Sequence, residues 1–384
     1  MRILKDNKFL KGVNIFFSAF GVLSFFGLIL LLITNLVGFG TLLSVVGLIK
    51  TQSLYDIEFS QMIQGSTIGI VESLEDPYSQ YLSQEKWEEL NIKLDAKFGG
   101  IGIYLLQDPD EGHLTVVSPI KGTPAAEAGI QNGDIIIGIN GETTQNMTQD
   151  QAVALMRGDP GTQVEIEIFR PEDSEEYTFK IVREIINVPS VEDDIIHDVP
   201  KIGYIHLNQF HSRSPQEMAE SINGLGEDQI DGLILDLRNN GGGDFDSAIY
   251  ISDYFLDGDE VVSVAGATGQ KEVFRAAPGN NTDIPMVVLV NQNSASASEI
   301  LAGALQDNGR AVLVGENTFG KGLVQKVYPL NDGGALKLTT QKYYTPKGTD
   351  IHEIGINPDY QVENTAEEDL QLKRAKEVLK QQLL

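Results

Sequence analysis

Residues 285–301 read PMVVLVNQNSASASEIL, and this stretch indicates the type of fold. Its first part, 285–290, is a continuous apolar run, as expected of a central β-strand that is buried on both faces. A turn of small, hydroxyl-bearing residues follows, and a helix that runs to about Asp307 begins there. Amides at a helix N-terminus carry partial positive charge, so a serine in this turn lies where a developing oxyanion can be stabilised.

The same pattern occurs elsewhere between 201 and 360. Residues 232–237, GLILDL, form a second apolar run, and each run is followed by a polar turn and a helical stretch. This alternation predicts an α/β domain. From about Glu367 to the end, the sequence predicts a charged amphipathic helix.

Ser296 has two interpretations. Ser296 and Glu299 have the Ser-x-x-Glu spacing of a capping box, which is a purely structural role. A catalytic serine needs a base, and residues 318–325, TFGKGLVQ, supply a lysine between two glycines in an otherwise apolar run. An unpaired lysine in such surroundings is costly to charge, so the pKa of Lys321 falls and its amine becomes a usable base near neutrality.

Gln325 is the candidate that orients this lysine. If 321–327 is a strand, Lys321 and Gln325 project from the same face, because side chains repeat every two residues. Gln325 then accepts a hydrogen bond from the amine and holds it toward Ser296. The alternative is a lysine on an exposed strand, with the two glycines making only a bend.

Residues 98–186 form a run of short strands and turns. Glycines at 99, 100 and 102 allow backbone amides to point inward and bind a terminal carboxylate, beside a strand edge that accepts an extended peptide. Taken alone, these glycines also fit a simple tight turn. Together with the later motifs at 118–119, 124–129 and 133–136, they resemble a PDZ domain, whose peptide-binding residues are then Gly100, Ile101, Gly102 and Ile103.

The motifs at 293–300 and 319–325 resemble those of the carboxy-terminal processing (tail-specific) peptidases. In that family the middle serine is the nucleophile, the glycine-flanked lysine is the base and the glutamine orients the lysine. The resemblance therefore assigns these roles to Ser296, Lys321 and Gln325. It covers most of 50–362, including LEDPYS at 74–79 and YYTPKG at 343–348. It implies a protease core of ββα units related to the crotonase fold, with the PDZ domain gating access.

Residues 236–243, DLRNNGGG, match a further motif of that family. The resemblance implies that a backbone amide at Gly241 or Gly242 faces the Ala297 amide and completes the oxyanion hole. A phosphate-binding loop is the competing interpretation, but the lysine and Ser/Thr of a P-loop are missing. One departure from the family is 351–354, IHEI, where we expect more neutral polar residues.

Composition excludes several functional classes. With 55 acidic and 28 basic residues the formal net charge is −27, so we expect no nucleic-acid partner. Cysteine is absent, which excludes disulfides and thiol nucleophiles. There is no His-Glu-x-x-His motif and no Gly-x-Ser-x-Gly elbow, and we expect neither a metal nor a cofactor. A Ser-His-Asp triad built from distant residues stays open, as does a PDZ scaffold on an inactive core.

The amino terminus predicts a membrane anchor. Arg2, Lys5, Lys8 and Lys11 precede an uncharged stretch, 12–49, which is long enough for one span at roughly 14–36. Basic residues favour the cytoplasmic side, so we expect a single-pass protein of the cell membrane with an extracytoplasmic catalytic domain. A cleaved signal peptide would have a shorter apolar region and a small-x-small site. A two-span hairpin, which would return the chain to the cytoplasm, is the other alternative.

The sequence thus predicts a multidomain α/β protein that acts on protein or peptide substrates through their C-termini. We also expect self-association through the N-terminal and C-terminal helices. The predicted parts are a cytoplasmic stub with a transmembrane helix (1–50), a helical segment (51–94), a PDZ domain (95–187), a serine protease core (188–362) and a C-terminal helix (363–384).

Overall fold

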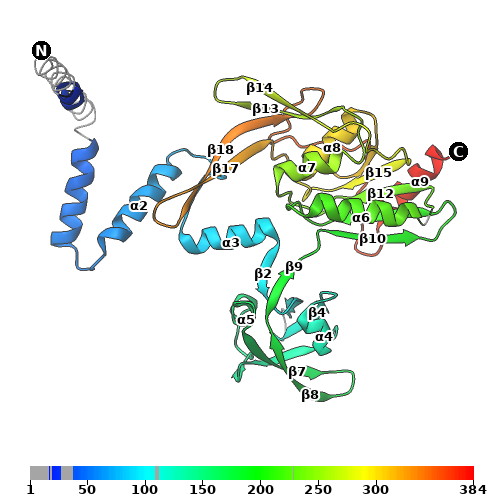
Figure 1. The fold of residues 1–384 in the computed structure, drawn as a ribbon, viewed down its shortest axis with the longest axis horizontal. Helices are drawn as coiled ribbons and strands as arrows, with labels where there is room; N and C mark the ends of the chain where they lie inside the picture. Colours follow the sequence, from blue (N-terminus) through cyan, green and yellow to red (C-terminus); the bar gives the residue numbers. More distant parts are fainter. Residues whose placement is uncertain (1–16, 18–19, 27–37, 109–111, 228) are drawn as a thin grey trace, which may run out of the picture. The chain divides into compact units, whose positions relative to one another are not determined.

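The computed structural model describes residues 17, 20–26, 38–108, 112–227 and 229–384 (Figure 1). The chain divides into two compact units, Met1–Pro77 and Tyr78–Leu384, which are treated separately. In the first unit, residues 38–52 are helical and α2 spans Phe59–Glu72. The Glu58 N–H donates to the Gln61 side chain at 3.1 Å at the start of α2. Phe59, Ile63 and Ile70 on this helix are exposed.

The predicted membrane span at 14–36 falls mostly on residues 14–16, 18–19 and 27–36, which lie outside the described residues. Within the described part of the chain, no helix combines the length and the apolar character needed to cross a membrane.

The second unit begins with β1 (Gln80–Leu82) and α3 (Gln84–Asp95), followed by a small β-rich module. Ser83 caps α3, and its side chain accepts from the Lys86 N–H. The module has a six-stranded sheet of order β3-β4-β5-β7-β8, with β6 on β5, and a separate β2–β9 pair. The element bounds are β2 Lys97–Gly100, β3 Ile103–Gln107, β4 Leu114–Pro119, α4 Pro124–Ala128, β5 Ile135–Ile139, β6 Glu142–Thr143, α5 Gln149–Met156, β7 Gln163–Arg170, β8 Glu175–Val182 and β9 Glu184–Asn187.

Local sequence signals explain how this module turns. Gly129 is the C-cap of α4 with φ +93°, a conformation that glycine adopts without strain. Asn140 and Gly141 join β5 to β6 in a tight turn with φ +53° and +80°. Inward residues of β7, at 164, 166 and 168, are fully or almost fully buried, as period-2 alternation requires.

The α/β domain is built on a six-stranded sheet of order β10-β11-β12-β15-β16-β19. All neighbours from β11 to β19 are parallel, whereas β10 is antiparallel to β11. The two apolar runs predicted as buried strands are β12 and β15, and every residue of both is buried. The bounds are β10 Val191–Ile196, β11 Ile202–Leu207, α6 Ser214–Glu227, β12 Gly232–Asp236, α7 Phe245–Ser252, β15 Met286–Val290, α8 Ala297–Asp307, β16 Val312–Gly315, β19 Tyr360–Gln361 and α9 Leu370–Gln382.

Helices cover both faces of this sheet (Figure 1). On β12, Leu233 and Leu235 face the cluster that includes α6, α7 and α8, whereas Ile234 faces α9 on the other side. The predicted C-terminal helix is therefore α9, which begins at Leu370. Its close approach depends on Gly232, where a Cβ would lie 2.8 Å from a methyl group of Leu379.

A second, five-stranded sheet has the order β1-β18-β13-β14, with β17 paired to β18. The remaining bounds are β13 Glu260–Gly266, β14 Lys271–Arg275, β17 Leu323–Pro329 and β18 Ala335–Tyr344. The premise that 321–327 forms one strand is wrong in detail. β17 begins only at Leu323 and has an irregularity between Val324 and Gln325, so Lys321 lies in the loop before it.

Candidate active site

Ser296 lies at the junction between the β15 loop and α8, where it is the N-cap residue of the helix. Its φ of +57° and ψ of −114° are rare for a residue with a side chain. Such a conformation costs free energy and persists only where surrounding contacts hold it. Residues in that state concentrate at active sites, and this one lies at the position predicted for the nucleophile.

Four hydrogen bonds hold the Ser296 backbone. Its N–H donates to Glu299 Oε2 at 2.8 Å. Its carbonyl accepts from the N–H groups of Glu299 (2.8 Å) and Ile300 (3.0 Å) and from the Tyr343 hydroxyl (3.1 Å). The Glu299 carboxylate therefore bonds back to the N-cap amide, as in the predicted capping box. The capping role and a catalytic role are compatible, because the capping contacts fix the turn.

Glu299 also reaches the lysine segment. Its side chain is fully buried and accepts from Thr318 Oγ1 at 2.6 Å, from the Gly320 N–H at 2.7 Å and from the Lys321 N–H at 2.9 Å. One carboxylate thus holds the backbone on both sides of the candidate site. The sequence interpretation gave Glu299 only a capping role. The available signal was an acidic residue at the start of a helix whose next residues, through 305, are all apolar or small.

Lys321 is partly buried and faces the same site. Burial is the largest cause that lowers the pKa of Lys321, and the positive charge of Lys337 lowers it further, while Glu299 acts in the opposite direction. Its Nζ lies 5.2 Å from the centre of the Tyr78 ring, within cation–π range. Among the described residues, no hydrogen bond joins Lys321 Nζ to Ser296 Oγ. In this state the amine lies over the Tyr78 ring, and Lys321 lines the same cavity as Ser296.

Gln325 lies at the same cavity but is not bonded to Lys321. Its Nε2 donates to the carbonyl of Leu323 at 3.3 Å. The irregularity after Val324 changes the simple two-residue repeat on which the shared face was predicted. Gln325 needs a side-chain rotation to reach the amine.

A cavity of about 550 Å³ brings the candidate residues together. Ser296, Ala297, Gly241, Gly242, Lys321 and Gln325 all line it. Lys337 and Tyr343 from β18 line it as well. Among the described residues that form its wall there is no histidine, so the arrangement gives no support to a Ser-His-Asp triad.

The loop that contains the motif at 236–243, called the glycine loop below, distinguishes between the two candidate oxyanion amides, Gly241 and Gly242. The Gly242 N–H already donates to Asn240 Oδ1 at 2.9 Å. Within the described part of the chain, the Gly241 N–H donates to no protein acceptor. Gly242 instead provides a close approach, because a Cβ there would lie 2.6 Å from the Ala295 carbonyl oxygen and 2.9 Å from the Ala297 nitrogen. The geometry therefore favours Gly241 as the partner of Ala297.

The predicted peptide site is a second cavity, of about 280 Å³, in the β-rich module. Gly100, Ile101, Gly102 and Ile103 line it opposite apolar residues of α5, among them Val153 and Met156. In the described residues, the N–H groups of Ile101 and Gly102 have no protein acceptor. Gly102 has φ +80°, and a Cβ there would lie 2.5 Å from Thr123. These features suit a backbone nest for a carboxylate beside an apolar side-chain pocket.

Both modules of this chain match known families. Residues 201–362 match the model of peptidase family S41, and residues 115–170 match the model of the PDZ domain. The chain is 41% identical to the carboxyl-terminal-processing protease of Synechocystis sp., over 76% of this chain and 69% of the relative. It is 37% identical to the carboxy-terminal processing protease CtpA of Bacillus subtilis, over 82% of this chain and 67% of that one.

Solved structures agree with these matches. A photosystem II D1 C-terminal processing protease superposes with a TM-score of 0.50 at 29% identity, over 81% of this chain and 84% of that one. A putative S41 protease from Bacteroides fragilis has the same fold, with a TM-score of 0.52 at 16% identity, over 86% and 92% of the two chains.

The fold and these matches together define a serine peptidase with a PDZ domain. The chain belongs to peptidase family S41, among the carboxyl-terminal-processing proteases.

Proposed function

We propose that this peptidase is a membrane-anchored endopeptidase in which Ser296 is the nucleophile and Lys321 is the general base. The observation that carries the proposal is the buried Glu299 carboxylate, which accepts the backbone N–H groups of both residues. The strained backbone of Ser296 and the lowered pKa of Lys321 support the same assignment.

The reaction requires a short movement of the amine. When substrate binds, neutral Lys321 leaves the Tyr78 ring and accepts the Ser296 Oγ proton while that oxygen attacks the peptide carbonyl. Gln325 turns from the Leu323 carbonyl to hold the amine in place. The resulting ammonium then gives its proton to the departing amine of the substrate, and water hydrolyses the acyl-enzyme.

The oxyanion of the tetrahedral intermediate is bound by the Gly241 and Ala297 amides. Both belong to backbone that is fixed before substrate arrives, because Asn240 accepts from the Ala295 N–H at 3.0 Å and from Ser298 Oγ at 2.8 Å. Donors of this kind contribute most when they need no rearrangement.

Substrates are recognised by their C-termini. The free amides of Ile101 and Gly102 bind the terminal carboxylate, the adjacent pocket takes an apolar last side chain, and the β3 edge pairs with the peptide. A substrate whose C-terminus is converted to a carboxamide should therefore show a raised KM relative to the same chain with a free carboxylate.

The N-terminal segment anchors the enzyme, with the catalytic domain on the extracytoplasmic side. The basic residues before the uncharged stretch 12–49 support this orientation. Protease treatment of intact cells should remove the catalytic domain. If it survives until the cells are lysed, the orientation is the reverse of the one proposed.

Self-association is proposed through the N-terminal helices. The apolar side of α9 is already packed on its own sheet, whereas Phe59, Ile63 and Ile70 of α2 are exposed. Light scattering of the detergent-solubilised chain measures its molar mass and tests this. The mass of a monomer at high protein concentration would contradict self-association.

The catalytic proposal is tested with the detergent-solubilised full-length chain and an unfolded polypeptide substrate. Ser296→Ala and Lys321→Ala should each abolish cleavage while the melting temperature stays near that of the wild type. Equal cleavage by all three proteins would exclude the dyad. Inactivity of all three, including the wild type, would favour a scaffold or a latent state.

A further inference from the structure

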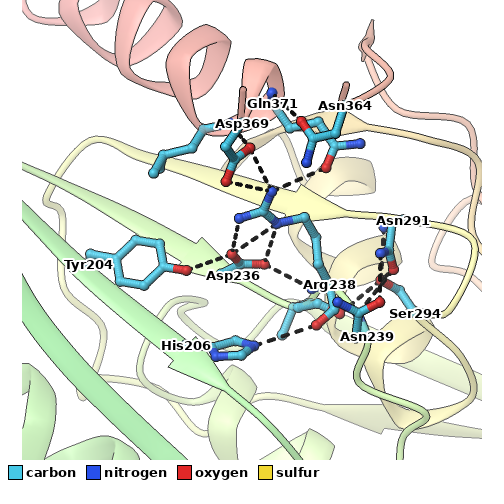
Figure 2. A network of polar contacts seen from close by, with 12 residues as sticks. Tyr204, His206, Asp236, Arg238, Asn239, Asn291, Ser294, Asn364, Asp369 and Gln371 are labelled. Atoms are coloured by element: carbon cyan, nitrogen blue, oxygen red, sulfur yellow. Dashed lines mark hydrogen bonds and ion pairs between the residues drawn. The ribbon is translucent and has the colours of Figure 1, made fainter. Parts of the chain in front are cut away.

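Arg238 is a buried charge at the start of the glycine loop. Its side chain is only 12% exposed. Nε and Nη2 bind the Asp236 carboxylate at 2.6 to 3.0 Å. Asp236 is itself 2% exposed and accepts from the Tyr204 hydroxyl at 2.6 Å. Figure 2 shows Tyr204, Asp236 and Arg238 in this network of contacts.

The third nitrogen of this guanidinium is held by the C-terminal helix. Nη1 donates to both carboxyl oxygens of Asp369, at 2.8 and 3.0 Å, and to Gln371 Oε1 at 3.2 Å (Figure 2). Asp369 is the N-cap of α9, and its Oδ1 also accepts from the Leu372 N–H at 2.9 Å. Burial raises the pKa of the Asp369 carboxyl, but the hydrogen bonds from Arg238 and the Leu372 N–H, together with the Arg238 charge, outweigh burial and keep that pKa below its usual value. The contact is therefore an ion pair at neutral pH.

The residues that follow Arg238 are hydrogen-bonded to the loop that ends at Ser296. The Arg238 N–H donates to Asp236 Oδ1 at 2.9 Å, which fixes the first turn of the loop. The next residue, Asn239, has φ +60°, and its side-chain oxygen accepts from the side-chain amides of Asn291 and Asn293 at 2.9 Å each. Those two residues belong to the loop that ends at Ser296.

Asn240, the next residue, is also hydrogen-bonded to the segment around Ser296. The Asn240 carbonyl accepts from the Ala295 N–H and from Ser298 Oγ, and its side chain accepts from the Gly242 N–H. The position of the Gly241 amide relative to Ser296 is thus set by a loop that is fixed at one end by Arg238.

We propose that Asp369 is a positioning residue for catalysis. Through Asp369, the C-terminal helix holds Arg238 and the glycine loop in a fixed position relative to Ser296. The match to the S41 family model ends at residue 362, so Asp369 lies beyond it. The inference rests on the proposed oxyanion role of Gly241 and adds α9 to the parts that set it.

The physical reason is that two carboxylates from different segments bind the one guanidinium of Arg238. With both carboxylates present, Asp236 binds Nε and Nη2 in a two-point contact while Asp369 binds Nη1, so all three nitrogens are held and the orientation of the guanidinium is fixed. Without Asp369 it keeps only the carboxylate of its own loop, and the loop is no longer tied to the sheet through α9. A displacement of about 1 Å at an oxyanion donor is enough to cost on the order of 10²-fold in rate.

The test compares two ion pairs of the same helix in the full-length detergent-solubilised chain. Asp369→Asn removes the contact with Arg238. Asp198→Asn is the matched control, because Asp198 accepts from Lys376 of α9 at 2.7 Å and lies outside the glycine loop. Both variants weaken attachment of α9, and both should lower the melting temperature slightly.

Only Asp369→Asn should change the chemistry. We expect its kcat to fall about 10- to 100-fold with KM within about twofold of the wild type, because the oxyanion donor acts in the transition state. The inhibition constant of a peptide aldehyde, whose hemiacetal oxygen occupies the oxyanion hole, should rise by a similar factor. Asp198→Asn should keep kcat and this inhibition constant within about twofold of the wild type.

Arg238→Lys gives an independent route if Asp369→Asn does not fold. Lysine keeps the charge but cannot make both two-point contacts, so a similar loss in kcat is expected. The double variant should be no slower than Arg238→Lys alone, since both changes act through one contact.

Equal kcat for Asp369→Asn and Asp198→Asn, or additive losses in the double variant, would overturn the proposal and leave α9 a stabilising element only. Such a result is distinct from failure of the dyad, in which Ser296→Ala would keep wild-type kcat.

Discussion

The backbone N–H groups of Ser296 and Lys321 donate to the same atom, Glu299 Oε2, at 2.8 and 2.9 Å. The two residues lie in separate loops, one before α8 and one before β17, so neither loop alone determines their spacing. The other oxygen of Glu299 accepts from Thr318 Oγ1 and the Gly320 N–H. A single buried carboxylate therefore fixes the backbone of the proposed nucleophile relative to that of the proposed base.

Glu299→Gln should separate these loops. Glutamine has one acceptor oxygen, so its NH₂ group would face two donors in a fully buried site. We expect a loss of about 2–4 kcal/mol in the free energy of unfolding. We also expect at least about a 10²-fold loss in kcat/KM below the melting temperature. Urea denaturation and steady-state kinetics check this, and a folded variant with wild-type kcat/KM would show that Glu299 does not set the geometry.

Gly242→Ala should push the glycine loop away from Ser296. The added Cβ would meet the Ala295 carbonyl oxygen at 2.6 Å, and the residue has φ +94°. Gly309→Ala is the control, because Gly309 also has positive φ (+69°) but has open space around it. Both variants carry about 1 kcal/mol of backbone strain. Only Gly242→Ala should lower kcat, by about 10²-fold or more; a similar kcat for both would contradict the packing argument.

Lys337→Met should shift the pH dependence of kcat/KM. The positive charge of Lys337 lowers the pKa of Lys321, so its removal raises that pKa. In the proposed mechanism the neutral amine is the base, so activity is expected above this pKa and is lost below it. The rising limb of kcat/KM against pH should shift to higher pH. Lys326→Met, on the opposite face of the neighbouring strand, is the control and should leave the limb in place. A shift to lower pH in Lys337→Met would contradict the electrostatic account.

Much of the fold could be predicted because local signals agreed with tertiary packing. The apolar runs at 232–237 and 285–290 became buried parallel strands, since only a doubly covered sheet accommodates them. The caps at Ser83 and Gly129 and the turn at Asn140-Gly141 are local in the same sense, because each depends on the backbone within a few residues. The domain limits and the roles of the site residues stay predictions.

What could not be predicted depends on contacts between distant segments. Glu299 was interpreted as a cap because its bonds to 318–321 join segments that no local pattern connects. Gly241 and Gly242 were equivalent in sequence, and only the bond from Gly242 to Asn240 separates them. The strand premise for Lys321 and Gln325 failed because β17 starts at Leu323, after two glycines that favour a loop. The Asp369–Arg238 pair was missed because its partners lie in different predicted domains.

The most direct test of the central claim measures how fast a fluorophosphonate ester modifies Ser296 as a function of pH, by intact-protein mass spectrometry. In the wild type the rate should rise with pH through one titration whose pKa lies below the ordinary lysine value of 10.5. In Lys321→Met the rate should fall by about 10²- to 10⁴-fold and lose that titration. A rate that is independent of pH between about 6 and 10, or equal in Lys321→Met, would contradict the assignment of this amine as the base.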